Sequence, residues 1–173
     1  MRRCLVTFLT LFVLWMLVAQ ANHSLAPWHV YLFVGGLFVT YPALVLPARA
    51  GLIATLLAGL VFDSATPVPF GLHTVLFAAA HLLIFNIRDR VPREETVTRV
   101  VIALLANLAI FLVFSFLEIA RIRVPGAVWP RLVFDLLCSQ VFLVLIGPWF
   151  FALQAAANAW ARPGGAAFDH DYE

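Results

Sequence analysis

Few side chains in this 173-residue sequence could do chemistry, and most of them lie in or beside apolar stretches. Asp63 ends one stretch, and His73 and His81 lie eight residues apart in the next. That spacing is roughly 80° around a helix, so the two histidines can share a face. No third ligand follows at a suitable spacing, so we expect no metal site. We expect Asp63 to form a turn, with its carboxylate accepting from the backbone amides of residues 64–66.

The remaining polar residues have ordinary structural interpretations. Arg131 and Asp135 are four residues apart on one predicted helix, where their charges largely neutralise each other. Cys4 and Cys138 have neither disulfide nor zinc-site spacing, which predicts two small buried side chains. Isolated polar residues within apolar stretches predict hydrogen bonds between helices, and these are Asn86, Asn107, Ser139 and Gln140.

Motifs that would indicate an enzyme are missing from the sequence. It contains no GxSxG serine, no HExxH pair, no phosphate-binding loop and no GxGxxG. The sequence therefore predicts no catalytic residue and no cofactor. The net charge of +2 gives no reason to expect a nucleic-acid partner.

The composition identifies the lipid bilayer as the solvent. Hydrophobic residues make up 64% of the chain and charged residues 12%, whereas soluble domains have about half apolar and about a quarter charged residues. A spanning helix needs about 20 mostly apolar residues. We predict an all-α integral membrane fold: one domain over residues 1–162 and a disordered cytoplasmic tail over 163–173. Its six predicted spans are Leu5–Ala19, Trp28–Leu46, Ala50–Phe62, Val68–Ile87, Val100–Leu117 and Leu132–Trp160.

The arginines give these spans an orientation. All eleven basic residues are arginine. Six spans from a cytoplasmic N-terminus place eight arginines inside and three outside, as the positive-inside rule requires. If the short third stretch did not span, the split would be six to five. Charge therefore favours six spans with both termini cytoplasmic. Arg2 and Arg3 followed by Ala19-Gln20-Ala21 also fit a cleaved signal peptide, although we favour a retained anchor.

Several local features are predicted within these elements. Gly51, Thr55 and Gly59 recur every four residues, a spacing that lets helices approach closely in lipid and places this short helix inside the bundle. Gly147-Pro148 predicts a kink in the last helix. Trp28 and Tyr31 are placed at the membrane interface. Three arginines form the only dense charge cluster, which we expect to face the cytoplasm: Arg88, Arg90 and Arg93.

The segment from Gly51 to His73 resembles a known family. Gly51-Leu52-Ile53 leads to Ala58-Gly59-Leu60-Val61-Phe62-Asp63, and Pro67, Pro69-Phe70-Gly71-Leu72-His73 follow. This run resembles the central signature of the MreD family of rod shape-determining proteins, whose length and span pattern are similar across essentially the whole chain. Residue by residue, the matching positions are Gly59, Asp63, Pro69 and Gly71.

The resemblance implies a function without catalysis. It implies a bacterial inner-membrane subunit of the cell-wall elongation machinery, partnered with an MreC-like membrane protein and, through it, with the MreB filament and the wall synthases. It also implies a fold similar to the substrate-binding subunits of energy-coupling-factor vitamin transporters.

Two other classes of function were weighed against this one. The alternative is a vitamin-binding transporter subunit of that six-helix type, which needs several convergent polar or aromatic groups near one membrane face. The available groups are Trp28, His29, Asp63, His73 and Trp129. A channel or ion transporter would need charges deep in the spans, and the sequence lacks them.

Overall fold

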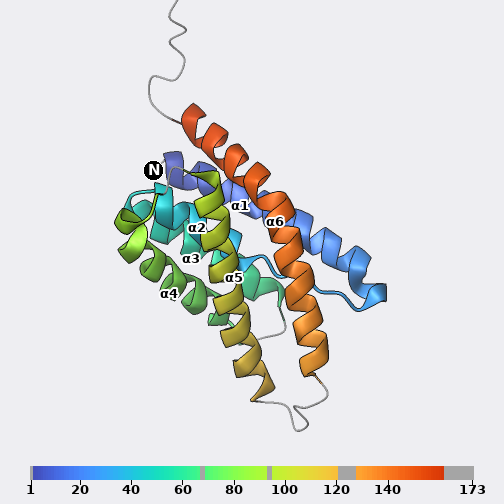
Figure 1. The fold of residues 1–173 in the computed structure, drawn as a ribbon. Coiled ribbons are helices and arrows are strands. Elements are labelled where there is room, and N and C mark those ends of the chain that lie inside the picture. Colours follow the sequence, from blue (N-terminus) through green and yellow to red (C-terminus); the bar gives the residue numbers. More distant parts are fainter. Residues whose placement is uncertain (1, 67–68, 93–94, 121–127, 162–173) are drawn as a thin grey trace, which may run out of the picture.

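The computed structural model describes residues 2–66, 69–92, 95–120 and 128–161, and within these ranges it is helical without strands (Figure 1). The α-helices are α1 (Arg2–Leu25), α2 (Gly35–Val45), α3 (Ala48–Ala65), α4 (Leu72–Ile87), α5 (Thr96–Ile119) and α6 (Trp129–Trp160). Two short 3₁₀ helices, η1 (Ala26–Trp28) and η2 (Arg88–Arg90), follow α1 and α4. The predicted all-α class is therefore confirmed for the described residues. The predicted tail over 163–173 lies outside them.

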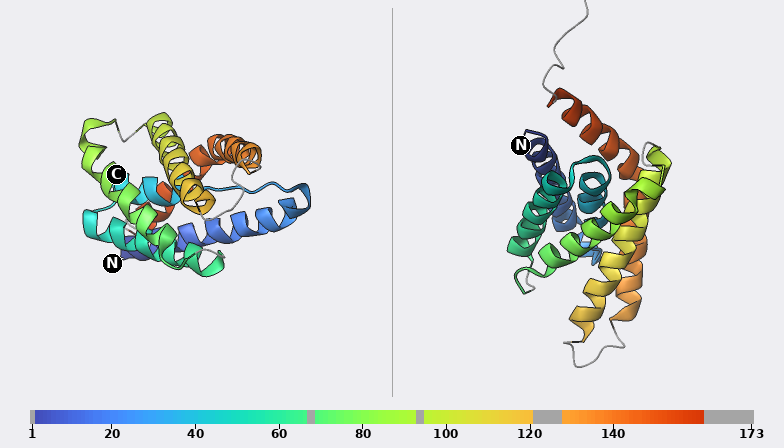
Figure 2. Two further views of the ribbon diagram at one scale, coloured as in Figure 1. Left: turned by 90° about the horizontal axis from the view of Figure 1, so that it is seen from below. Right: turned by 90° about the vertical axis from the view of Figure 1, so that its left-hand side faces the viewer.

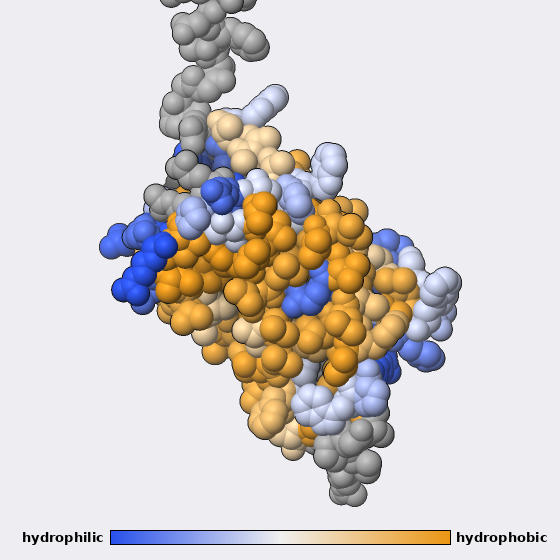
Figure 3. All heavy atoms as spheres, in the orientation of Figure 1, coloured by the Kyte–Doolittle hydropathy of each residue, from blue (hydrophilic) through white to orange (hydrophobic). Residues whose placement is uncertain are grey.

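The described helices fit a membrane protein. Four of them, α1 with η1, α3, α5 and α6, are long and apolar enough to cross a bilayer. The face seen in Figure 3 is largely apolar, and hydrophilic residues gather toward its opposite ends. The 16-residue α4 and the 11-residue α2 are shorter, and at 1.5 Å per residue α2 extends only about 16 Å.

The second predicted helix is much shorter than expected. Trp28–Leu46 was predicted as one helix, but residues 30–34 are not helical and α2 begins only at Gly35. We call residues 30–34 the extended segment. The extended segment leads from the outer end of α1 into the middle of the bundle (Figures 1 and 2). Gly36 explains part of this path, because a Cβ there would collide with the Ala103 carbonyl of α5. Helix α2 therefore packs closely on α5 from its second residue onward.

Helix α2 forms the centre of the molecule. Ten of its eleven residues are buried, and it packs against α3, α4, α5 and α6. Phe38 lies edge-on to Phe62 of α3, with ring centroids 4.9 Å apart, and stacks on Phe77 of α4. The short helix is thus the core on which the longer helices assemble.

Other elements differ from the predictions in detail. Helix α3 has 18 residues and not thirteen, and it is not wholly interior, because Ile53 and Leu57 are exposed on one face. Helix α1 extends beyond the predicted end of the first span at Ala19, so that Asn22 lies in its last turn. Helix α6 continues through Pro148, in agreement with the single last span that was predicted. The first turn of α1 and the last turn of α6 lie at the same end of the molecule (Figure 1).

Candidate functional site

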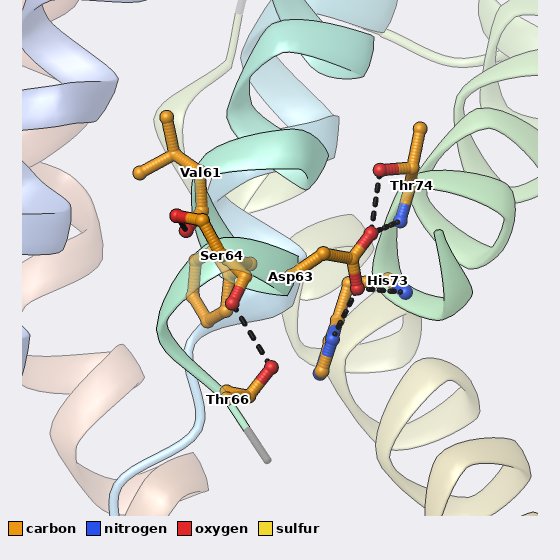
Figure 4. Close-up of polar contacts among 7 residues, drawn as sticks. Val61, Asp63, Ser64, Thr66, His73 and Thr74 are labelled. Carbon is orange, nitrogen blue, oxygen red and sulfur yellow. Dashed lines mark hydrogen bonds and ion pairs between the residues drawn. The ribbon is translucent and has the colours of Figure 1, made fainter. Parts of the chain in front are cut away.

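The strongest polar cluster lies where α3 meets α4, and we call residues 63–74 the elbow. The Asp63 carboxylate, 3% exposed, accepts four hydrogen bonds there (Figure 4). Its Oδ1 accepts from the backbone N–H of His73 at 2.8 Å and lies 3.0 Å from His73 Nδ1. Its Oδ2 accepts from the backbone N–H of Thr74 at 3.0 Å and from the Thr74 hydroxyl at 2.6 Å. A side chain of α3 therefore caps the first turn of α4.

The geometry of the chain before α4 explains why this cap comes from another helix. The first amides of a helix have no intrahelical partner, and the residue preceding α4 is Gly71, which has no side chain to cap them. Gly71 has φ +97°, a conformation that favours glycine. A Cβ at Gly71 would meet no atom within 4 Å. Backbone conformation, and not space, therefore explains the glycine at this position.

The small-residue stripe of α3 continues the same contact along the helix. A Cβ on Gly59 would lie 2.6 Å from Cα of Thr74. One turn earlier, Thr55 Oγ1 lies 3.1 Å from Nδ1 of His81. Gly51 continues the row, since a Cβ there would lie 2.8 Å from the His81 ring. The two histidines thus share the face of α4 that packs on α3, as their spacing predicted.

Aromatic rings enclose the histidine of the elbow. His73 is 1% exposed, and its ring centroid lies 4.9 Å from that of Phe114 of α5 and 5.6 Å from that of Phe62. Phe33, in the extended segment, and Phe77 complete the surroundings at 6.3 and 6.1 Å. The elbow is therefore joined through His73 to α5 and to the extended segment before α2.

The geometry of Asp63 and His73 suits a structural role. An aspartate bonded to a histidine can orient a general base, but such a base must reach a nucleophile or a substrate. His73 is buried among phenylalanine rings, and the hydroxyl of Thr74 donates to the carboxylate and not to the imidazole. An ionised carboxylate only accepts hydrogen bonds, so His73 Nδ1 carries the hydrogen in that state. The arrangement fixes one helix against another.

One prediction about this site was wrong. Asp63 does not accept from the amides of residues 64–66, because its side chain points across to α4. Ser64 and Thr66 instead donate their hydroxyls to carbonyls of their own helix, at Val61 and Phe62 (Figure 4). The reason is burial: Asp63 faces inward, whereas Ser64 is exposed at the surface.

The other residues that the sequence analysis selected lie near the elbow or at the other end of α4. The Pro69 carbonyl accepts from the Leu72 N–H at 3.2 Å, closing the turn before α4. Arg88 donates to the Leu46 carbonyl at 3.1 Å and lies 3.9 Å from the centroid of the Phe85 ring. Arg90 is exposed in η2. Arg93 lies outside the described residues. The structure thus separates Arg88 and Arg90 from the elbow by the length of α4.

A second polar network, around the extended segment, was not predicted as a unit. Three successive N–H groups donate to side chains of other helices: Tyr31 to Asp135 at 3.0 Å, Leu32 to Asn22 at 2.7 Å, and Phe33 to Ser139 at 2.9 Å. At the start of α2, the Gly36 N–H donates to Asn107 of α5 at 3.1 Å. Backbone groups without helical partners are thereby paired inside an apolar bundle, as lipid-buried backbone requires.

Only some of the residues in this network could be predicted from the sequence. Asn107 and Ser139 were predicted to bond between helices. Asn107 of α5 does so, since it accepts from the Gly36 N–H of α2. Ser139 of α6 instead accepts from the Phe33 N–H of the extended segment. Asp135 was predicted to pair with Arg131. Its Oδ2 does lie 3.9 Å from Arg131 Nε, but its Oδ1 accepts from the Tyr31 N–H. Gly35-Gly36 was the available sign of a helix break.

No three histidine, cysteine, aspartate or glutamate residues in the described ranges are grouped so that they could hold a metal ion. Comparisons with protein-family models, with curated proteins and with solved structures find no match to this chain.

Proposed function

We propose that this chain is a non-catalytic membrane subunit of a bacterial cell-wall elongation machinery, which binds an MreC-like membrane protein and helps to organise peptidoglycan synthesis and cell shape. The observation that carries the proposal is the elbow. Of the four positions that match the MreD signature, Asp63, Pro69 and Gly71 lie in the elbow, and Gly59 packs against its Thr74. They determine how α3 and α4 meet.

A joint of this kind supports partner binding because it sets the direction of α4. One face of α4 packs on α3 through its buried histidines, and the opposite face exposes large apolar side chains. Val75 is 66% exposed, Leu82 57% and Leu83 69%. In lipid, helices associate through packing and hydrogen bonds between them, so a fixed direction favours a specific partner helix. We propose an inner-membrane location with both termini cytoplasmic and six spans.

The experiment is co-purification with an MreC-like protein, combined with rescue of rod shape in a deletion strain. Gly71→Val places a β-branched residue at φ +97°, which costs about 1–3 kcal/mol, and should reduce both readouts. Gly71→Asn is the matched variant, because asparagine tolerates positive φ better than valine does. It should retain more of each readout.

Two outcomes would contradict the proposal. Wild-type shape and full co-purification with Gly71→Val, at normal membrane levels, would show that the elbow plays no part in partner binding. Failure of the wild-type chain to bind any MreC-like protein would remove the proposed partner.

The alternative function, vitamin binding, has one observation in its favour. A cavity of about 200 Å³ opens beside the extended segment and is lined by Trp15, Asn22, Tyr31 and Thr66, among others. Ligand pockets are usually about 300–1,000 Å³, and both ends of the Asn22 amide are already bonded to Leu32. Retention of a vitamin-sized molecule by the purified protein, without a protein partner, would favour this alternative.

A further inference from the structure

A groove between α1 and α3 combines an apolar floor with two positive charges at one end. Its volume is about 570 Å³, within the range of about 300–1,000 Å³ that is usual for ligand sites. Arg2 of α1 and Arg49 of α3 line it, and both arginines are exposed. The two helices start at the same end of the molecule and pack against each other. Their arginines are therefore neighbours at one membrane surface.

The walls below the arginines are apolar. On α3, Ile53 and Leu57 follow Arg49 at intervals of four residues, so the three form one stripe. On α1, Leu5 and Phe8 form the facing wall. From Arg49 to Leu57 the groove extends about 12 Å along the helix at 1.5 Å per residue. A ligand that fits must have an anionic end at the surface and an apolar part within the hydrocarbon.

We propose that this groove is a binding site for one anionic phospholipid, whose phosphate lies between Arg2 and Arg49 and whose acyl chain lies between α1 and α3. Charge complementarity favours a lipid with net negative charge over a zwitterionic one, because an ammonium group in the headgroup would be repelled by both guanidinium groups. Arginine also suits a phosphate better than lysine does, because its planar donors can bind two oxygens. The inference is independent of the proposed function, since none of these residues belongs to the elbow.

The test uses the purified full-length chain in nanodiscs made from equal amounts of phosphatidylglycerol and phosphatidylcholine with identical acyl chains. Lipids that stay bound after transfer to mild detergent are identified by native mass spectrometry. An arginine near the surface changes the affinity for an anionic lipid by roughly fivefold. We therefore expect a preference for phosphatidylglycerol of about 25-fold. The double variant Arg2→Gln/Arg49→Gln should lose it.

Two further variants test the assignment. Arg90→Gln, an exposed arginine outside the groove, is the matched charge control and should retain the preference. Leu57→Trp should fill the groove and reduce retention of both lipids without changing a charge. A phosphatidylglycerol with a photoreactive acyl chain should label residues 5–8 and 53–57.

Three results would overturn the proposal. They are equal retention of the two lipids by the wild-type chain, an equal loss of preference in Arg90→Gln, and labelling spread evenly over all exposed helices. A co-purified helix that crosslinks to Cys4, which also lines the groove, would identify a protein as its occupant and would equally contradict a lipid site.

Discussion

Asp63 illustrates how much a single side chain can do inside an apolar bundle. Its two carboxylate oxygens satisfy two backbone amides, a hydroxyl and an imidazole, all belonging to two successive residues of α4. Both donors of His73 are buried, and leaving a buried donor without a partner costs about 1–3 kcal/mol. The carboxylate therefore contributes to the stability of the α3–α4 joint.

The stability of Asp63 variants should fall with the number of hydrogen-bond acceptors that each substitution removes. Asp63→Asn keeps one acceptor oxygen but turns an amide NH₂ toward existing donors, so we expect a moderate fall in thermal stability. Asp63→Leu removes the acceptor of all four donors, two of them buried, and should lower the melting temperature further, with reduced membrane levels. Thermal unfolding in detergent measures the melting temperature of each variant, and the amount of protein in isolated membranes gives its membrane level.

Asp89 is the control for this series, because its side chain is 78% exposed. Asp89→Leu should leave the melting temperature nearly unchanged. Equal melting temperatures for Asp63→Leu and Asp89→Leu would show that the four bonds contribute nothing to stability.

Single residues also show how far the sequence predicted the site. Asp63 and Gly71 were selected as the two ends of the connection between the third and fourth stretches, because a carboxylate ending an apolar stretch and a glycine beside prolines are local signals. The acceptor role of Asp63 was assigned to the wrong amides. Its real partners lie ten and eleven residues away, and their direction depends on how two helices pack, which residue order does not specify.

At the scale of elements, the α3–α4 contact is controlled by backbone approach. Gly59 and Thr74 come so close that no Cβ fits between them. Gly59→Ala should therefore push the helices apart and destabilise the protein by about 1–3 kcal/mol. Gly147→Ala is the matched control, since a Cβ at this buried glycine would lie 3.5 Å from Val100, an ordinary contact.

Thermal unfolding of the two glycine variants checks this prediction. We expect a clear loss of stability for Gly59→Ala and little change for Gly147→Ala, even though both positions are buried within helices. The reverse order would mean that the stripe on α3 does not determine the packing distance.

The start of α2 depends on side chains contributed by distant helices. Asn107→Leu should leave the Gly36 N–H without an acceptor and lower stability by about 1–3 kcal/mol. Asn86→Leu, at an exposed position of α4, should have little effect. Hydrogen exchange at Gly36 should accelerate in the Asn107 variant alone, and unchanged exchange there would contradict the assigned bond.

The second apolar stretch also marks where the prediction of elements failed. Hydropathy identified residues 28–46 as one apolar stretch, but it could not separate a helix from non-helical backbone. In lipid, extended backbone is normally excluded because its amides have no partner. Asn22, Asp135 and Ser139 supply those partners from α1 and α6, over separations that no local pattern encodes.

For the whole molecule, the arginine distribution predicts the membrane topology, and this prediction can be tested. With six spans, reporter fusions after His29 and Thr66 should read as external, and a fusion after Glu94 should read as internal. The prediction depends on whether α2 and α4, the shortest of the described α-helices, cross the membrane. An external reading after Glu94 would eliminate the six-span model.

The extended segment before α2 has a consequence for biogenesis. Its amides at Tyr31 and Phe33 are paired by residues of α6, which leave the ribosome about a hundred residues later. Until α6 is inserted, this early part of the chain must keep those amides in contact with water or with the insertion machinery, because hydrocarbon offers them no acceptor. A nascent chain arrested before α6 should therefore be accessible to proteases and chaperones at residues 30–34. Helix α2, although the second to be synthesised, should be among the last to reach its final position.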